Sequence, residues 1–125
     1  MLSKNNKIFN FPQYGEIWLL ANPERIKEIS KDCRPVLIIS GDERNKYSES
    51  VVTLPLTTDE PKSVLPVEVF IDNTLETGLD YPSKILCDSP FTWDKGLRFD
   101  KRLGVAGKEI MKQVKKAWRI AFELE

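Results

Sequence analysis

The sequence contains no histidine among its 125 residues. This absence excludes metal sites built on imidazole ligands, and it excludes nucleophiles activated by a neighbouring histidine. Any catalysis therefore has to use carboxylates, arginine, lysine or hydroxyl groups.

Cysteine, net charge and long apolar runs are also scarce. Cys33 and Cys87 are the only two cysteines, and without a secretory signal we expect both to be reduced thiols in the cytoplasm. Basic and acidic residues number 19 each, so nucleic-acid binding would need a local basic patch. Because no apolar run approaches the length of a membrane span, we predict a cytoplasmic protein with no membrane contact.

What is present is typical of one globular domain over residues 1–125. Hydrophobic residues make up 41% and charged residues 30% of the chain, and this length can bury a core. Short apolar segments bounded by turn residues predict a mainly β fold, a small and strongly bent antiparallel sheet or barrel.

The expected elements follow from local patterns. We expect five strands, over 15–20, 35–39, 51–56, 65–71 and 83–88. Before and between them we expect an N-terminal arm over 1–14, a capped helix over 22–30, a loop over 41–50 and turns over 72–82. The region 92–107 should have little regular structure. Pro55 argues that the third strand has an edge or a bulge. Apolar residues at helical spacing predict an amphipathic C-terminal helix over about 108–125.

Arg34 occupies the junction between a charged segment and a continuous apolar run. The run Val36–Ile39 is short and β-branched, as expected of a strand buried on both faces. Pro35 has no N–H for a strand ladder, so it fits where a strand begins. The guanidinium of Arg34 should therefore lie at the rim of the core, where it could meet a ligand or simply form a surface ion pair.

Several segments together resemble the MazF/PemK toxins. In order and approximate spacing they are Tyr14–Leu19, Arg34–Ile39, Asn45–Ser48, Pro55–Thr57, Ile85–Asp88 with Thr92 and Asp94, and Lys101–Gly104. The resemblance extends over nearly the whole chain from Gly15 onward. It implies an SH3-like β-barrel with a C-terminal helix. It also implies a homodimer that, without metal or cofactor, cleaves single-stranded RNA at selected sequences and is held inactive by a cognate antitoxin.

The same resemblance assigns candidate catalytic residues. The arginine before the proline of the family falls on Arg34, its threonine at the end of the third strand on Thr57, and the aspartate of PemK-type members on Asp88. Cleavage through the 2′-hydroxyl of the RNA needs a base, an acid and a cation for the developing charge. Asp88 could be the base, Arg34 the phosphate clamp and also the acid, and Thr57 a hydrogen-bond donor to phosphate.

Five further residues are candidates for RNA contact. They are Arg44, Asn45 and Lys46 in the loop after the central strand, Thr58 at the exit of the third strand, and Trp93 near Phe91. Aromatic rings stack on unpaired bases in single-strand binders, although Trp93 and Phe91 could equally pack beneath a loop. Likewise, Thr57 and Asp88 could be ordinary turn residues.

The chain departs from the family in its first loop and at two later positions. The first loop, Asn22–Cys33, has no glycine where the family loop is usually Gly-rich, and it lacks the family's Glu-Gln pair before the arginine and the histidine of PemK-type members. Leu86 replaces an arginine of PemK-type members, and Phe91 stands where those members often have a basic residue. Two alternatives therefore stay open. The chain could be a toxin of the same fold that binds a protein, as CcdB-type gyrase poisons do, or a degenerate relative that binds without cutting.

Overall fold

The structure, a computed structural model, describes residues 11–21, 33–96 and 99–124. Its elements are β1 (Glu16–Ala21), β2 (Cys33–Ile38), α1 (Asp42–Tyr47), β3 (Ser50–Thr57), β4 (Glu68–Ile71), β5 (Ser83–Leu86), β6 (Phe91–Asp94), β7 (Phe99–Val105) and α2 (Lys108–Phe122). The helix predicted over 22–30 and most of the predicted N-terminal arm lie outside the described residues.

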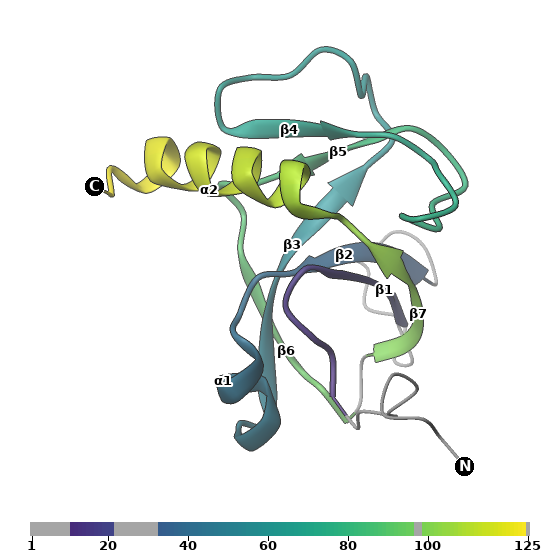
Figure 1. Cartoon of the computed structure of the whole chain (residues 1–125), viewed down its shortest axis with the longest axis vertical. Coiled ribbons are helices and arrows are strands. Elements are labelled where there is room, and N and C mark those ends of the chain that lie inside the picture. The colour runs from purple at the N-terminus through teal and green to yellow at the C-terminus, as the bar shows by residue number, and fades with distance from the viewer. Residues whose placement is uncertain (1–10, 22–32, 97–98, 125) are drawn as a thin grey trace.

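All pairings in the seven-stranded sheet are antiparallel. Its order is β4-β5-β3-β2-β1-β7, and β6 pairs with β3 beside this path. Figure 1 shows β3 running from the half that holds β6 to the half that holds β4 and β5. The mainly β class with a C-terminal helix is confirmed. In the described chain, however, the end strands β4 and β7 do not pair, so the sheet is bent but not a closed barrel.

Pro55 lies where β3 changes its neighbour. The first half of β3, Ser50–Thr53, pairs with β6, whereas Leu56 and Thr57 pair with β5. Between them, Leu54 and Pro55 have described pairings with β2 alone. A proline without an N–H is tolerated at such a break in the ladder, which agrees with the edge or bulge expected there.

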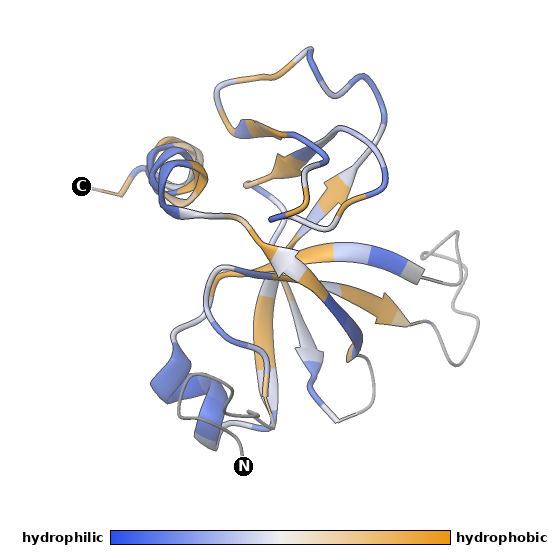
Figure 2. Ribbon diagram, turned by 45° about the vertical axis from the view of Figure 1, so that its right-hand side comes forward, coloured by the Kyte–Doolittle hydropathy of each residue, from blue (hydrophilic) through white to orange (hydrophobic). Residues whose placement is uncertain are grey.

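One face of the sheet forms the hydrophobic core with α2. Ile17, Leu37, Leu54, Leu56 and Ile85 are almost fully buried, together with Met111, Val114 and Ala117 of the helix. Figure 2 shows hydrophobic residues along the strands and on the side of α2 that faces them. The amphipathic pattern therefore predicted this helix correctly, with an end at Phe122.

Two regions differ from the prediction. The loop expected over 41–50 contains α1, and the region 92–107 contains most of β6 and all of β7. The helix α1 has only six residues, DERNKY, and its sequence has no apolar stripe from which a helix could be predicted. The strand β7 is mostly exposed over its first residues and pairs only with β1 among the described strands, so its charged sequence shows little alternation.

No helix in the described parts of the chain is both long and apolar enough to span a membrane.

Candidate active site

The second face of the sheet carries a cavity of about 300 Å³. Leu20 is paired with Arg34, and Val36 with Pro55, and residues directly opposite one another in antiparallel strands project to the same face. The cavity is lined by these four residues and by Thr53, Leu86, Ser89, Phe91 and Trp93. It therefore lies on the opposite side of the strands from the core.

Arg34 is the second residue of β2 and is half-buried in this wall. It is the only charged side chain among the described residues that line the cavity, and no acid of the described chain forms an ion pair with it. A guanidinium in a wall whose other described residues are uncharged is suited to bind a phosphate through its fixed fork of donors. Arg34, which the sequence placed at the rim of the core, thus lines a cavity.

Thr57 ends β3 close to the same face. The β2–β3 register pairs Val36 with Pro55, and continuing it by two residues brings position 34 opposite position 57. The Thr57 hydroxyl accepts a hydrogen bond from the N–H of Asp59 at 3.1 Å. Its own O–H remains a donor, although Thr57 is not among the residues that line the cavity.

Asp88 is exposed in the turn that follows β5. The N–H of Ser89 closes this turn on the carbonyl of Leu86 at 3.3 Å, and the Ser89 hydroxyl donates to Oδ1 of Asp88 at 3.2 Å. Ser89 lines the cavity and Asp88 does not. The predicted carboxylate therefore stands next to the cavity wall in sequence, with its lone pairs open to solvent.

Asn45 does not have the environment expected of an RNA contact. Its side chain is fully buried. The amide Nδ2 donates to the carbonyls of Pro12 at 3.1 Å and Ser40 at 2.9 Å, and Oδ1 accepts from the Ser40 hydroxyl at 2.5 Å. Because its amide groups are used inside the protein, this prediction is corrected: Asn45 anchors α1.

Arg44 and Lys46 lie on the same helix and are exposed. The guanidinium of Arg44 donates to the carbonyl of Ser50 at 2.7 Å and to its hydroxyl at 3.1 Å. The ammonium of Lys46 lies 5.3 Å from the centre of the Tyr47 ring. Neither side chain lines the cavity, so the structure separates both from Arg34.

The remaining two candidates have different positions. Thr58 is exposed directly after β3 and is not part of the cavity wall. Trp93 is part of that wall, and its ring stacks on Phe91 with centroids 5.7 Å apart and planes 26° apart. Of the five candidate RNA contacts, Trp93 alone lies in the wall that contains Arg34.

Sequence reasoning missed several residues of this wall. Thr53 is fully buried, and its hydroxyl donates to the carbonyl of Phe91 at 3.2 Å, which fastens β6 to β3. Leu20, Val36, Leu86 and Ser89 complete the wall. Only the strand register brings these positions together, and the sequence pattern did not predict β6.

The nearby cysteine is not a nucleophile of this site. Cys87 is a free thiol with no exposed surface, and it belongs to the core cluster. Burial, together with the negative charges of Asp88 and Glu68, raises the pKa of the Cys87 thiol to about 12. The thiol therefore stays protonated at neutral pH, and the reactive form of cysteine, the thiolate, is not populated.

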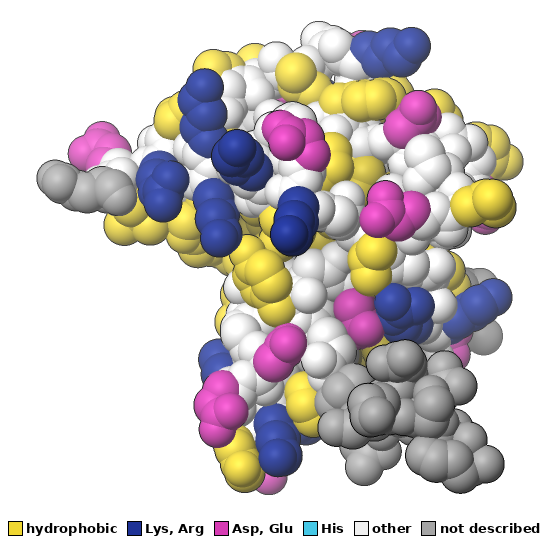
Figure 3. Space-filling model, in the orientation of Figure 1, with side chains coloured by type: hydrophobic (Ala, Val, Ile, Leu, Met, Phe, Trp, Pro, Cys, Tyr) yellow, Lys and Arg dark blue, Asp and Glu magenta, His cyan; other side chains and the backbone are white. Residues whose placement is uncertain are grey.

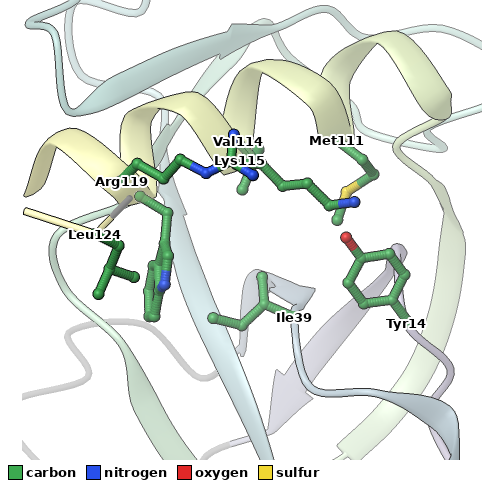
Figure 4. A pocket seen from close by; sticks show the side chains of 8 residues that line it. Tyr14, Ile39, Met111, Val114, Lys115, Arg119 and Leu124 are labelled. Carbon is green, nitrogen blue, oxygen red and sulfur yellow. The ribbon is translucent and has the colours of Figure 1, made fainter. Parts of the chain in front are cut away.

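A second hollow, of about 410 Å³, lies under α2, next to the core residues Met111 and Val114. Its apolar lining includes Ile39, Met111 and Val114, with Tyr14 at one end and Lys115 and Arg119 along the helix (Figure 4). Figure 3 shows Lys and Arg side chains gathered over α2. They are the exposed residues Lys108, Lys112, Lys115, Lys116 and Arg119. This surface is apolar with a basic rim.

A comparison with known protein families shows which family the chain belongs to. Residues 13–122 match the sequence model of the PemK-like, MazF-like toxins of type II toxin–antitoxin systems. The chain belongs to this toxin family. The predicted MazF/PemK relationship is therefore confirmed, and the match includes every described strand.

Individual MazF proteins agree with this assignment. The protein is 35% identical over 91 residues to Endoribonuclease MazF of Staphylococcus saprophyticus, an alignment that covers 73% of this chain and 74% of the relative. A mycobacterial endoribonuclease solved in complex with its cognate antitoxin superposes with a TM-score of 0.71 at 21% identity, covering 91% of this chain and 97% of the other. The Mycobacterium tuberculosis toxin MazF-mt6 gives a TM-score of 0.71 at 24% identity, covering 88% and 98%. These structures show the MazF fold.

Proposed function

We propose that this MazF-family chain, as a single toxin domain, is an endoribonuclease that cuts single-stranded RNA without a metal ion. One observation carries the proposal: Arg34 is the only charged side chain among the described residues of an aromatic-lined cavity in a chain of this family. The 35% identity with Endoribonuclease MazF supports the same reaction. A cation in a partly desolvated wall stabilises charge more strongly than it would in water.

The reaction would use the RNA's own nucleophile. The 2′-oxygen attacks the adjacent phosphorus and loses its proton to a base. The bond from phosphorus to the 5′-oxygen breaks as that oxygen takes up a proton from Arg34 or from a water molecule. The products are a 2′,3′-cyclic phosphate and a 5′-hydroxyl. Arg34 would bind the non-bridging oxygens, where negative charge increases in the transition state.

Thr57 and Asp88 have supporting places in this scheme. The free O–H of Thr57 would donate to a phosphate oxygen, because its register position is opposite Arg34. The exposed carboxylate of Asp88, beside the cavity residue Ser89, would take the 2′-hydroxyl proton. A positioned base of this kind typically contributes about 10²- to 10⁴-fold to a rate.

The RNA would extend beyond the cavity along exposed polar side chains. Thr58, Arg44 and Lys46 are available at the surface for phosphate contacts, and Trp93 contributes an aromatic ring inside the cavity. Asn45 has no part in the proposal because its side chain is enclosed.

We also propose a cognate antitoxin, a homodimer and a cytoplasmic location. A solved relative is an endoribonuclease in complex with its cognate antitoxin, and the chain belongs to a family of toxins paired with antitoxins. The apolar hollow under α2, with Lys115 and Arg119 at its edge, is suited to a protein partner that carries acidic groups. A cytoplasmic location would place the toxin with cellular RNA.

A same-fold toxin or binding protein that does not cut RNA is the second candidate. It is supported by the apolar residues Leu86 and Phe91 in the cavity wall, at positions where related toxins carry basic residues. Such a protein would keep the cavity and lose the chemistry.

The test uses purified protein and a long single-stranded RNA in EDTA, with mapping of the cut ends. We expect wild type to leave cyclic phosphates and Arg34→Ala to abolish cleavage while remaining folded. Lys112→Ala, which removes one positive charge from the exposed face of α2, is the matched control and should cut normally. Intact RNA with folded wild-type protein would favour the second candidate.

A further inference from the structure

Two aromatic residues of β6 lie in the cavity wall together with Arg34. Phe91 and Trp93 are two residues apart, so their side chains project to the same face of the strand. Their rings form a stacked pair with centroids 5.7 Å apart. Phe91 is 51% exposed, although it is a large hydrophobic residue, whereas Trp93 is half-buried. One aromatic ring of the pair is thus presented to solvent and supported by the other.

The backbone that carries this pair is held in place. Phe91 pairs with Thr53 and Trp93 with Val51 in the β3–β6 ladder, and both β3 residues are fully buried. The hydroxyl of Thr53 also donates to the carbonyl of Phe91 at 3.2 Å. The strand segment that carries the exposed ring is therefore fixed before any ligand arrives, which lowers the ordering cost of binding.

The surroundings of the pair indicate which ligand it takes. Stacking on a flat ring and a cation for phosphate are the two requirements for binding a single-stranded nucleic acid, and the same cavity contains both. The rest of the wall is uncharged and is formed by Leu20, Val36, Thr53, Pro55, Leu86 and Ser89.

We propose that Phe91 stacks on one unpaired base of the RNA while Arg34 binds a phosphate next to that base. The inference rests on the endoribonuclease function proposed above and assigns Phe91 as a substrate-binding residue, with Trp93 as its support. A base must leave its neighbours to stack in this way, so the contact selects single strands over duplexes. Stacking tolerates every base, so the recognition of sequence has to come from other contacts.

The test compares Phe91→Leu, Phe91→Ala and Phe91→Tyr with wild type. Leucine keeps an apolar side chain and loses the aromatic face, whereas tyrosine keeps the face. Tyr81→Leu is the matched control, because Tyr81 is a 67% exposed aromatic residue outside the cavity. Cleavage of single-stranded RNA gives kcat and KM. Binding is measured by fluorescence anisotropy with a labelled random-sequence 2′-O-methyl 12-mer pool, which cannot be cut.

We expect Phe91→Leu and Phe91→Ala to weaken binding by at least about fivefold, the lower limit for one base stacked on an aromatic ring. KM should rise in parallel and kcat should change little, because the contact exists before the reaction. Phe91→Tyr and Tyr81→Leu should resemble wild type. Phe91→Arg should steepen the salt dependence of binding by about 0.7 in log–log slope, since it adds one phosphate contact to a single strand.

Other outcomes would overturn the inference. Unchanged binding and KM in Phe91→Leu would remove Phe91 from the substrate site, and so would a loss of self-association without a loss of RNA binding, which would make Phe91 part of a protein interface. If wild type binds the pool without cutting RNA, the proposed cleavage fails, and the binding comparison alone decides the role of Phe91. If wild type neither binds nor cuts, both proposals are wrong.

Discussion

At the residue scale, the proposed chemistry depends on groups that differ in burial. Arg34 is half-buried, whereas Asp88 is exposed. A base that exchanges protons with solvent can be reset after each turnover, and a cation that is partly desolvated interacts more strongly with phosphate. The exposure of Asp88 therefore suits a base, and the partial burial of Arg34 suits a phosphate-binding cation.

Asp88→Asn should lower kcat by about 10²- to 10⁴-fold and leave KM nearly unchanged, because asparagine keeps the shape but cannot accept the proton. Steady-state cleavage of a single-stranded RNA gives both constants. Ser89→Ala removes only the hydroxyl that donates to Asp88 at 3.2 Å and is the control with a small effect. An Asp88→Asn enzyme with normal kcat would rule this carboxylate out as the base.

Cys87 should make stability depend on pH in the alkaline range. The pKa of its thiol is raised from 9.0 to about 12 in the folded protein, so the folded state holds a proton that the unfolded state releases. The contribution is fully present below about pH 9 and is lost as pH rises towards 12, by at most about 1.4 kcal/mol per pH unit. Urea unfolding at several pH values should give a flatter profile for Cys87→Ala; parallel profiles would contradict this account.

At the element scale, Gly104 of β7 lies in close contact with the backbone of Glu76, in the turns after β4. A Cβ on Gly104 would lie 2.2 Å from the carbonyl oxygen of Glu76, whereas a Cβ on Gly41 would meet nothing within 4 Å. Gly104→Ala should therefore cost at least about 1–3 kcal/mol of unfolding free energy, as overpacking does. Gly41→Ala should be close to neutral in the same urea titration. Equal stabilities of the two variants would show that this contact adjusts freely.

The short helix α1 depends on one buried side chain. Asn45→Ala leaves the carbonyls of Pro12 and Ser40 without the donor they now share, and an unsatisfied buried polar group costs about 1–3 kcal/mol. Lys46→Ala, on the exposed side of the same helix, should change stability by less than about 0.5 kcal/mol. Thermal or urea unfolding separates the two. A neutral Asn45→Ala would show that these hydrogen bonds do not stabilise α1.

These elements also show what the sequence could reveal. The apolar run after Pro35 and the stripe of α2 were predicted correctly because burial imposes a pattern on neighbouring residues. The start of this strand was predicted at Pro35, whereas β2 begins at Cys33 and has Arg34 as its second residue, because pairing with β1 extends the strand beyond the proline. In contrast, α1 depends on hydrogen bonds between Asn45 and residues distant in sequence, and β6 is largely exposed, so neither leaves a local signal.

The cavity was predictable only in part for the same reason. Arg34 and Trp93 were identified from the sequence, but their meeting in one wall depends on the register of β1, β2, β3 and β6. Thr53, a fully buried threonine, could be identified only once that register was known. Residue types thus indicated the chemistry, whereas strand pairing decided which residues act together.

At the scale of the whole molecule, a formal net charge of zero means that long-range attraction contributes little to RNA binding. Binding should then depend on a few local phosphate contacts. We expect Arg34→Ala to reduce the slope of log affinity against log salt by about 0.7 in magnitude, the value for one phosphate of a single strand. Anisotropy with the 2′-O-methyl 12-mer pool at several salt concentrations measures it. An unchanged slope would show that Arg34 does not contact phosphate.

The pairing of β1 with β7 has a consequence for the time at which the protein becomes dangerous to its cell. Glu16 lies opposite Val105, and the core is completed by Met111, Val114 and Ala117 of α2. The strand β1 is synthesised early but can pair with β7 only after β7 has been synthesised, and contacts so distant in sequence form slowly. A chain still under synthesis has neither a finished sheet nor a closed core. Complete folding, and with it any toxic activity, is therefore expected only after α2 has been synthesised.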